Sequence, residues 1–330
     1  MKQNLLKKML VGTMILCAPF TLTSCDDIIS SIFDNPVTQE TTDGSGGSSQ
    51  TSNDNGGSSA TSETYIKYTA PGTKTNEPIG NATKWTYTTT ANVPAGTYYV
   101  EGTVNCNGAL TLQGEVNLIL KDGATLTVKD GISPYFDGSD YVGSLNIFAQ
   151  SEGTSMGHLI VKNDTPVGVS PNTEATALAV MALTIHGGLI DVTADTGTTP
   201  ADYGGDGIEI PSGTGNMIFY AGTVNATGKK GRQGIVNWAS GKIEFDGANV
   251  TAIGGDHTTT GAAGIQGTTL VVNKGTVTAK GGNGATIGFG TSFTTVTLGD
   301  GITMKEGATE PPTTAVTTPY AASQRYVLFQ

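Results

Sequence analysis

The feature that most constrains the fold is a short unit that recurs between Leu183 and Gly301. Each unit has a small anchor residue, with apolar residues five and three places before it and two and four places after it. Because side chains alternate between the two faces of a strand, each unit is predicted to be two short strands joined at a bend that the small residue permits. The anchors are Gly188, Gly222, Ala248, Gly275 and, in a weaker fifth copy, Gly301.

The same alignment gives the period of the repeat and its inward side chains. Successive anchors are 34, 26, 27 and 26 residues apart, so the repeat is about 26 residues long. A third strand is predicted before most pairs, starting at Ile208, Ile235, Ile265 and Ile287. The expected core column next to the anchors is Ile185, Phe219, Phe245 and Val272.

Three strands per repeat at a near-constant period indicate a coil stacked on itself. One such unit cannot bury its apolar face alone, whereas stacked units align their inward residues into a continuous core. The sequence therefore predicts an all-β chain that forms a single-stranded parallel β-helix with three strands per rung. A β-sandwich or a propeller is the competing fold, but the regular small residues and the lack of a blade signature disfavour both.

Outward positions form two rows along the predicted stack. One row contains His186, Tyr220, Asp246 and Asn273, and the other contains Asp191, Asn225, Thr251 and Thr278. Extending the first row to an earlier rung adds Phe148. We therefore expect Phe148, His186 and Tyr220 to form an aromatic strip on a flat outer face.

The first 24 residues have the layout of a secretory signal: Lys2, Lys7 and Lys8, then an apolar run too short to span a membrane. Small residues precede Cys25, so the segment resembles a bacterial lipoprotein signal, which implies that Cys25 is lipidated. Asp26 and Asp27 resemble the surface-export signals of Bacteroidota lipoproteins. The expected location is the outer membrane, lipid-anchored and exposed at the cell surface. An ordinary signal peptide with an incidental Cys25 is the alternative.

The rest of the chain divides by composition. Residues 25–62 are rich in Ser, Gly and Thr and are predicted to be a tether, because they cannot bury a core. Residues 63–108 are interpreted as an N-terminal cap with the first strands, 109–305 as the β-helix and 306–330 as a C-terminal tail or cap. With Cys17 in the signal and Cys25 lipidated, Cys106 has no partner, so neither a disulfide nor a cysteine metal cluster is expected.

The charge excludes one class of partner. The formal net charge is −11, and Arg232 and Arg325 are the only arginines in the sequence. Recognition of phosphates needs an excess of Lys and Arg, so we expect no nucleic-acid partner. We expect a monomer.

Repeated short sequences carry a resemblance to a known family. The stretches 222–228 and 274–282, with Gly264-Ile265 and Ala285-Thr286-Ile287-Gly288, resemble the Gly-Thr-Val-Thr-Ala repeats of bacterial cell-surface proteins. The chain is similar, over roughly residues 95 to 305, to carbohydrate-binding-domain lipoproteins of gut and cellulolytic bacteria. That resemblance implies a right-handed β-helix of the pectate-lyase-like superfamily. It maps no catalytic or binding residue onto this chain, since fold rarely fixes function.

The favoured hypothesis is that the chain binds an extracellular polysaccharide without cleaving it. The candidate ligands are plant glycans and uronic-acid glycans. Phe148, His186 and Tyr220 would stack on sugar rings, while Asp246 and Asn273 would hydrogen-bond to hydroxyl groups. Plain solvent-facing decoration of a sheet is the simpler interpretation of these side chains. An adhesin or structural surface protein is the first alternative function.

A Ca²⁺-dependent polysaccharide lyase is the second alternative. It would use Asp202, Asp206 and Glu209 as metal ligands and Lys230 or Arg232 as the base. The simpler interpretation of these charges is a patch of ion pairs between neighbouring rungs. Apart from Ca²⁺ in this alternative, no cofactor is expected.

Overall fold

The computed structural model describes residues 63–163, 176–194, 204–257, 261–285, 287–290, 292–317 and 322–330. These residues belong to one compact unit, Ala60–Gln330. Within them the chain forms strands and no helix, and accordingly none that is long and apolar enough to cross a membrane. The predicted signal, Cys25, the tether up to residue 62 and Asp202 lie outside the described residues.

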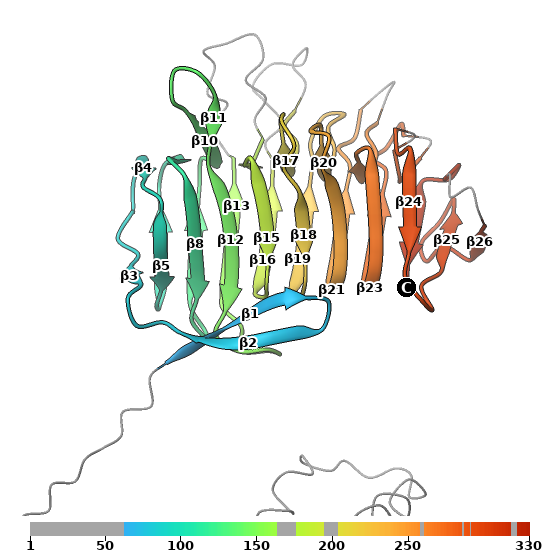
Figure 1. Ribbon diagram of the computed structural model, residues 1–330. Coiled ribbons are helices and arrows are strands. Elements are labelled where there is room, and N and C mark those ends of the chain that lie inside the picture. The colour runs from blue at the N-terminus through green and yellow to red at the C-terminus, as the bar shows by residue number, and fades with distance from the viewer. Residues whose placement is uncertain are drawn as a thin grey trace, which may run out of the picture. The chain divides into compact units, whose positions relative to one another are not determined.

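Parallel strands form three stacks, and each rung adds one strand to each stack (Figure 1). The first stack contains β3 (Thr83–Lys84), β5 (Gly96–Val100), β8 (Glu115–Leu120), β12 (Ser144–Ala149), β15 (Ala182–Ile185), β18 (Met217–Phe219), the first halves of β21 (Lys242–Ile253) and β23 (Thr269–Lys280), and β24 (Thr295–Leu298). The second contains β6 (Thr103–Cys106), β9 (Thr125–Val128), β13 (His158–Lys162), β16 (Leu189–Thr193), β19 (Thr223–Thr227) and the second halves of β21 and β23. The third contains β4 (Ala91–Val93), β7 (Leu110–Leu112), β10 (Ile132–Phe136), β14 (Leu178–Ala179), β17 (Ile208–Ile210), β20 (Ile235–Asn237) and β22 (Ile265–Gln266).

The register of the repeat is confirmed. Leu183 pairs with Met217, which pairs with Ile243, which pairs with Leu270, as the anchor alignment predicts. In the third stack Ile208, Ile235 and Ile265 are paired in the same way. An all-β chain with long stacks of parallel strands is compatible with the predicted β-helix. Parallel pairing already begins at β3, within the segment 63–108 that we interpreted as a cap with the first strands.

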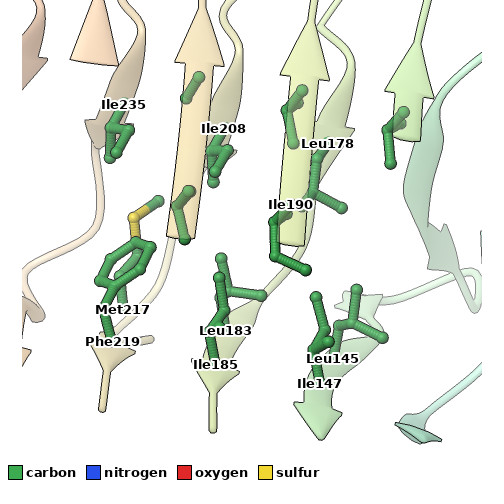
Figure 2. Packing of buried hydrophobic residues seen from close by; sticks show 14 of the residues in the cluster. Leu145, Ile147, Leu178, Leu183, Ile185, Ile190, Ile208, Met217, Phe219 and Ile235 are labelled. Atoms are coloured by element: carbon green, nitrogen blue, oxygen red, sulfur yellow. The ribbon is translucent and has the colours of Figure 1, made fainter. Parts of the chain in front are cut away.

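The core runs along the inside of the three stacks. Ile185, Phe219, Phe245 and Val272 are fully buried, and the rings of Phe219 and Phe245 stack with centroids 4.8 Å apart. Figure 2 shows Leu and Ile side chains from neighbouring rungs meeting there in register. Aligned inward residues therefore form a single hydrophobic core, as expected when repeated units bury each other.

Glycines let the backbone bend between the first and second stacks. Gly188 and Gly222 have positive φ angles of 101° and 91°. A Cβ on Gly222 would lie 2.5 Å from the carbonyl oxygen of Gly188 on the previous rung. Gly222 therefore needs to lack a side chain both for its backbone conformation and for the close stacking of rungs, whereas the anchor Ala248 has no positive φ.

The last rung departs from the repeat. The third-stack strand expected at Ile287 is wrong in register, because Phe289 forms the bridge to Ile265 and its ring packs on Phe293 and Phe329. After Gly301 the parallel pairing gives way to antiparallel pairing. β25 (Met304–Gly307) pairs antiparallel with β26 (Thr314–Val316) and with β27 (Tyr326–Phe329), and β27 also pairs with the second half of β23. β26 and β27 lie within 306–330, the segment that we interpreted as a C-terminal tail or cap.

Two hairpins stand outside the repeat. β1 (Thr64–Ala70) and β2 (Thr73–Pro78) form an antiparallel pair that runs across the lower ends of the stacked strands in Figure 1. At the opposite ends of the strands, β11 (Tyr141–Val142) pairs with the outer half of β10 and extends the third stack into a projecting hairpin.

Candidate functional site

The predicted aromatic strip exists as a ladder at the bend between the first two stacks. The rings of Phe148 and His186 are stacked 4.4 Å apart with 6° between their planes, and His186 and Tyr220 are 5.3 Å apart at 19°. These three residues sit at the same position of successive rungs, which brings them into contact. We call Phe148, His186 and Tyr220 the bend ladder.

The bend ladder is not an open flat face, and this part of the expectation is wrong. Phe148 and His186 are only 3% and 6% exposed, because the β1–β2 hairpin lies over them. Tyr65 packs edge-on against Phe148, and Tyr68 stacks on Tyr220 with centroids 5.8 Å apart and planes 9° apart. Ile79, just after β2, joins Phe148 and Ile119 in a small apolar cluster. Outward-pointing rings on three rungs are thus the docking surface for the hairpin.

His186 is a neutral hydrogen-bond acceptor in this contact. Its Nδ1 accepts the backbone N–H of Tyr68 at 3.0 Å, so the ring proton is on Nε2. Burial, with a smaller contribution from the charge of Lys67, lowers the pKa of His186 to about 4. The uncharged form of His186 therefore makes the hydrogen bond that holds the hairpin.

A groove of about 510 Å³ lies beside the hairpin, next to the paired rings of Tyr68 and Tyr220. Glu152 lines it and accepts hydrogen bonds from the Tyr68 hydroxyl and, at 2.6 Å, from Lys74 Nζ. Further polar groups come from Asp246, Asn249 and Lys274 on the next two rungs. We call this the hairpin groove, and it combines aromatic rings with carboxylate, amide and ammonium groups.

Asp246 is the buried acid of the hairpin groove. It is 3% exposed, and its Oδ1 accepts a hydrogen bond from Asn273 Nδ2 at 2.6 Å. Burial raises the pKa of this carboxyl. A bulge shifts the pairing here, so Asp246 lies opposite Lys274 and Asn273 does not continue the ladder in strict register. The predicted residues Asp246 and Asn273 are therefore together, with Asn273 acting on Asp246.

A second groove of about 280 Å³ lies on the other side of β1, along the outer face of the first stack. Lys67 and Glu115 line it, with Asn117 and Asn146 on its floor. The amide Nδ2 of Asn146 donates to Asn117 Oδ1 at 2.9 Å. The second outward row lies on the outer face of the second stack, where Asp191 Oδ1 accepts from Asn225 Nδ2 at 2.8 Å and Asp191 Oδ2 lies 2.7 Å from His158 Nε2.

One residue of the lyase alternative, Asp206, is far less accessible than a catalytic metal ligand needs to be. Asp206 is 0% exposed, and its Oδ1 accepts the backbone N–H of Gln233 at 2.6 Å. Burial first, and then the charge of Glu209, raises the Asp206 pKa well above its usual range. Ca²⁺ prefers ionised carboxylates, so a fully buried carboxyl with a raised pKa is a poor ligand.

The other described members of that alternative, Glu209, Lys230 and Arg232, are partly buried. Burial raises the pKa of Glu209, whose Oε2 accepts the Thr176 hydroxyl at 3.0 Å. Burial lowers the pKa of Arg232, and Lys230 has a left-handed backbone with φ of 46°. Among the described residues, no group of three or more His, Cys, Asp or Glu side chains is placed to hold a metal ion, and Asp202 is not among them.

The hairpin itself is what the sequence interpretation missed. Strands were expected from Tyr65 onwards, but not their return across the bend ladder. The signal that could have found it is Pro71-Gly72 between two runs of alternating residues, since Gly at positive φ is typical of a tight hairpin turn.

No protein-family model matches this chain, and no curated protein or solved structure is significantly similar to it.

Proposed function

We propose that this chain is a lipid-anchored protein of the outer cell surface that folds as a right-handed parallel β-helix and binds extracellular polysaccharide without cleaving it. The binding site of this proposal is the hairpin groove rather than an open strip. Lipidation at Cys25 and the outer-membrane location rest on the resemblance of the first 27 residues to surface lipoproteins.

The observation that carries the proposal is the mixture of groups that converge in the hairpin groove. Aromatic rings stack on the apolar faces of sugars, and carboxylates and amides exchange hydrogen bonds with their hydroxyls. The groove offers Tyr68 and Tyr220 for the first role, and Asp246 and Asn249 for the second. Its elongated setting, across several rungs and beside the hairpin, suits a chain-like ligand.

Two observations favour binding over cleavage. Asp206 is fully buried and burial raises its pKa, which disfavours the Ca²⁺-dependent lyase. In the hairpin groove the acids already serve the structure, because Asp246 is held by Asn273 and Glu152 by Tyr68 and Lys74. An adhesin remains the alternative function, and it predicts protein ligands instead of glycans.

The test is retention of the purified chain on a panel of plant and host polysaccharides, with and without Ca²⁺. Asn249→Ala combined with Lys274→Ala removes two exposed groove residues and leaves in place the ring contacts of Tyr65 and Tyr68 with the bend ladder. Asn105→Ala combined with Lys129→Ala is the matched control, since both residues are exposed on early rungs away from the groove. We expect the groove variant to weaken binding about 30-fold and the control variant to bind normally, because two hydrogen bonds are lost and each is worth about 1 kcal/mol.

Three other results would count against the proposal. Equal retention of both variants would show that the polysaccharide does not bind in the hairpin groove. New absorbance from unsaturated uronate that depends on Ca²⁺ would show a lyase. No retention on any polysaccharide would favour the adhesin.

A further inference from the structure

Exposed aromatic side chains gather at a second place, at the edge of the third stack. Phe136 and Tyr141 are 52% and 50% exposed, and their rings are 5.2 Å apart on the projecting β10–β11 hairpin. Trp238, directly after β20, is 44% exposed. These are the exposed large hydrophobic residues of the described part of the chain, and all three belong to the third stack or to the hairpin that extends it.

Strand register joins them into a row. Leu178, Ile208 and Ile235 are paired in succession, so the residues three places later occupy equivalent positions on three rungs. Those residues are Met181, Pro211 and Trp238, and the backbone N–H of Met181 donates to the carbonyl oxygen of Gly143 at the base of the β10–β11 hairpin. The backbone N–H of Trp238 donates to Ile210 at 3.0 Å, which continues the pairing to this position.

Side chains of the row point outward. Val180, Ile210 and Asn237, each one place earlier, are buried, whereas the row residues are partly exposed. Because successive residues of a strand face opposite sides, the row faces solvent. We call Met181, Pro211 and Trp238, together with the exposed rings of Phe136 and Tyr141 on the adjoining hairpin, the edge row.

We propose that the edge row is a second binding surface, which stacks on the ring faces of an uncharged polysaccharide chain. This inference rests on the proposed function and adds a site and a substrate class to it. Rungs repeat at about 4.8 Å, close to the length of one sugar unit in an extended chain, so each rung can meet one ring. A folded protein partner is disfavoured, because a stable protein interface needs about 800 Å² on each side and the row is one residue wide.

The charges near the edge row favour an uncharged glycan over an acidic one. The residues after the row are small and uncharged: Ser212, Gly213 and Thr214 follow Pro211, and Ala239, Ser240 and Gly241 follow Trp238. Exposed acids, Asp137 and Asp140, lie at the tip of the β10–β11 hairpin, where Asp137 Oδ1 is occupied by the turn. Carboxylates accept hydrogen bonds from sugar hydroxyls but repel uronates, and the chain as a whole carries −11.

In Figure 1 the β10–β11 and β1–β2 hairpins lie at opposite ends of the stacked strands. The edge row adjoins the first hairpin, and the hairpin groove adjoins the second. One polysaccharide site can therefore be tested without the other. Trp238 supplies the probe, because the chain has two tryptophans and the other, Trp85, is 4% exposed.

The experiment is acrylamide quenching of tryptophan fluorescence in the full chain, with mixed-linkage β-glucan, xylan or polygalacturonate added. Trp238→Phe gives the background from Trp85. We expect the uncharged polymers to shield Trp238 from acrylamide and polygalacturonate not to do so. Phe136→Ala combined with Tyr141→Ala is expected to weaken shielding about tenfold, because two aromatic contacts are lost. Asn249→Ala with Lys274→Ala is expected to leave shielding in place.

Binding of an uncharged polymer without any shielding of Trp238 would overturn the proposal that the edge row binds polysaccharide. It would leave the proposed site in the hairpin groove standing. Shielding that survives Phe136→Ala with Tyr141→Ala, or that polygalacturonate produces equally, would also overturn it. Absence of binding to any polymer would remove both this inference and the proposed function.

Discussion

Replacing Phe219 with Ala tests whether the inward register holds the fold together. Phe219 is fully buried, is paired between Ile185 and Phe245 on neighbouring rungs, and stacks on the Phe245 ring at 4.8 Å. Backbone hydrogen bonds to both neighbouring rungs fix the spacing, so the walls of the new cavity cannot close. We therefore expect a loss of about 3 to 5 kcal/mol in the free energy of unfolding.

The measurement is urea denaturation followed by circular dichroism. Phe136→Ala is the matched control, because the same side chain is removed from a position that is 52% exposed. It is expected to cost less than about 1 kcal/mol. A loss below 1 kcal/mol in Phe219→Ala, or an equal loss in both variants, would refute the assignment of inward and outward faces.

Three further predictions concern the bend ladder, the anchor glycines and the buried acid. His186 has a pKa of about 4 in the folded chain against 6.5 normally, so the unfolded state binds the proton first and stability falls as pH drops from about 6.5 to 4. The denaturation midpoint of His186→Gln, whose side-chain oxygen can still accept the Tyr68 N–H, should fall less over this range, and equal pH profiles would contradict the buried neutral histidine. Gly222→Ala should lower the melting temperature more than Gly123→Ala, since both glycines have positive φ but a Cβ meets backbone only at Gly222; equal shifts would show that rung stacking leaves room there. The raised pKa of Asp206 means that the folded state keeps a proton which the unfolded state loses, so this group's stabilisation is lost as pH rises towards its folded pKa. Asp206→Asn should therefore gain stability relative to the unmodified chain between pH 5 and 8 in the same denaturation assay, and a strong loss would argue for an ionised role.

The repeat could be predicted because every rung uses the same chemistry. Leu183, Met217, Ile243 and Leu270 share a place in the alignment and share a column in the core, since a period of two fixes which side of a strand each residue faces. The prediction failed where a rung stops repeating. Phe289 replaces Ile287 as the bridging residue because its ring fills the end of the core against Phe293 and Phe329.

The candidate site was predictable only in part. Alignment brought Phe148, His186 and Tyr220 together, but an outward direction within one rung does not tell whether another segment covers the position. Tyr65 and Tyr68 lie about 80 to 150 residues away along the chain from the rings they cover. Such non-local contacts have no periodic signal, so the burial of His186 and the groove beside the hairpin follow from the structure alone.

Hydrogen–deuterium exchange of the chain with and without a bound polysaccharide tests the central claim most directly. The account predicts slower exchange in β1 and β2 and at the bends that carry Tyr220 and Asp246, because a ligand in the hairpin groove contacts both sides of it. Exchange in the second stack around Asn105 and Thr127 should not change. Two results would contradict binding in the hairpin groove. One is protection confined to the second stack around Asn105 and Thr127, and the other is a bound polysaccharide that leaves the hairpin and both bends unprotected.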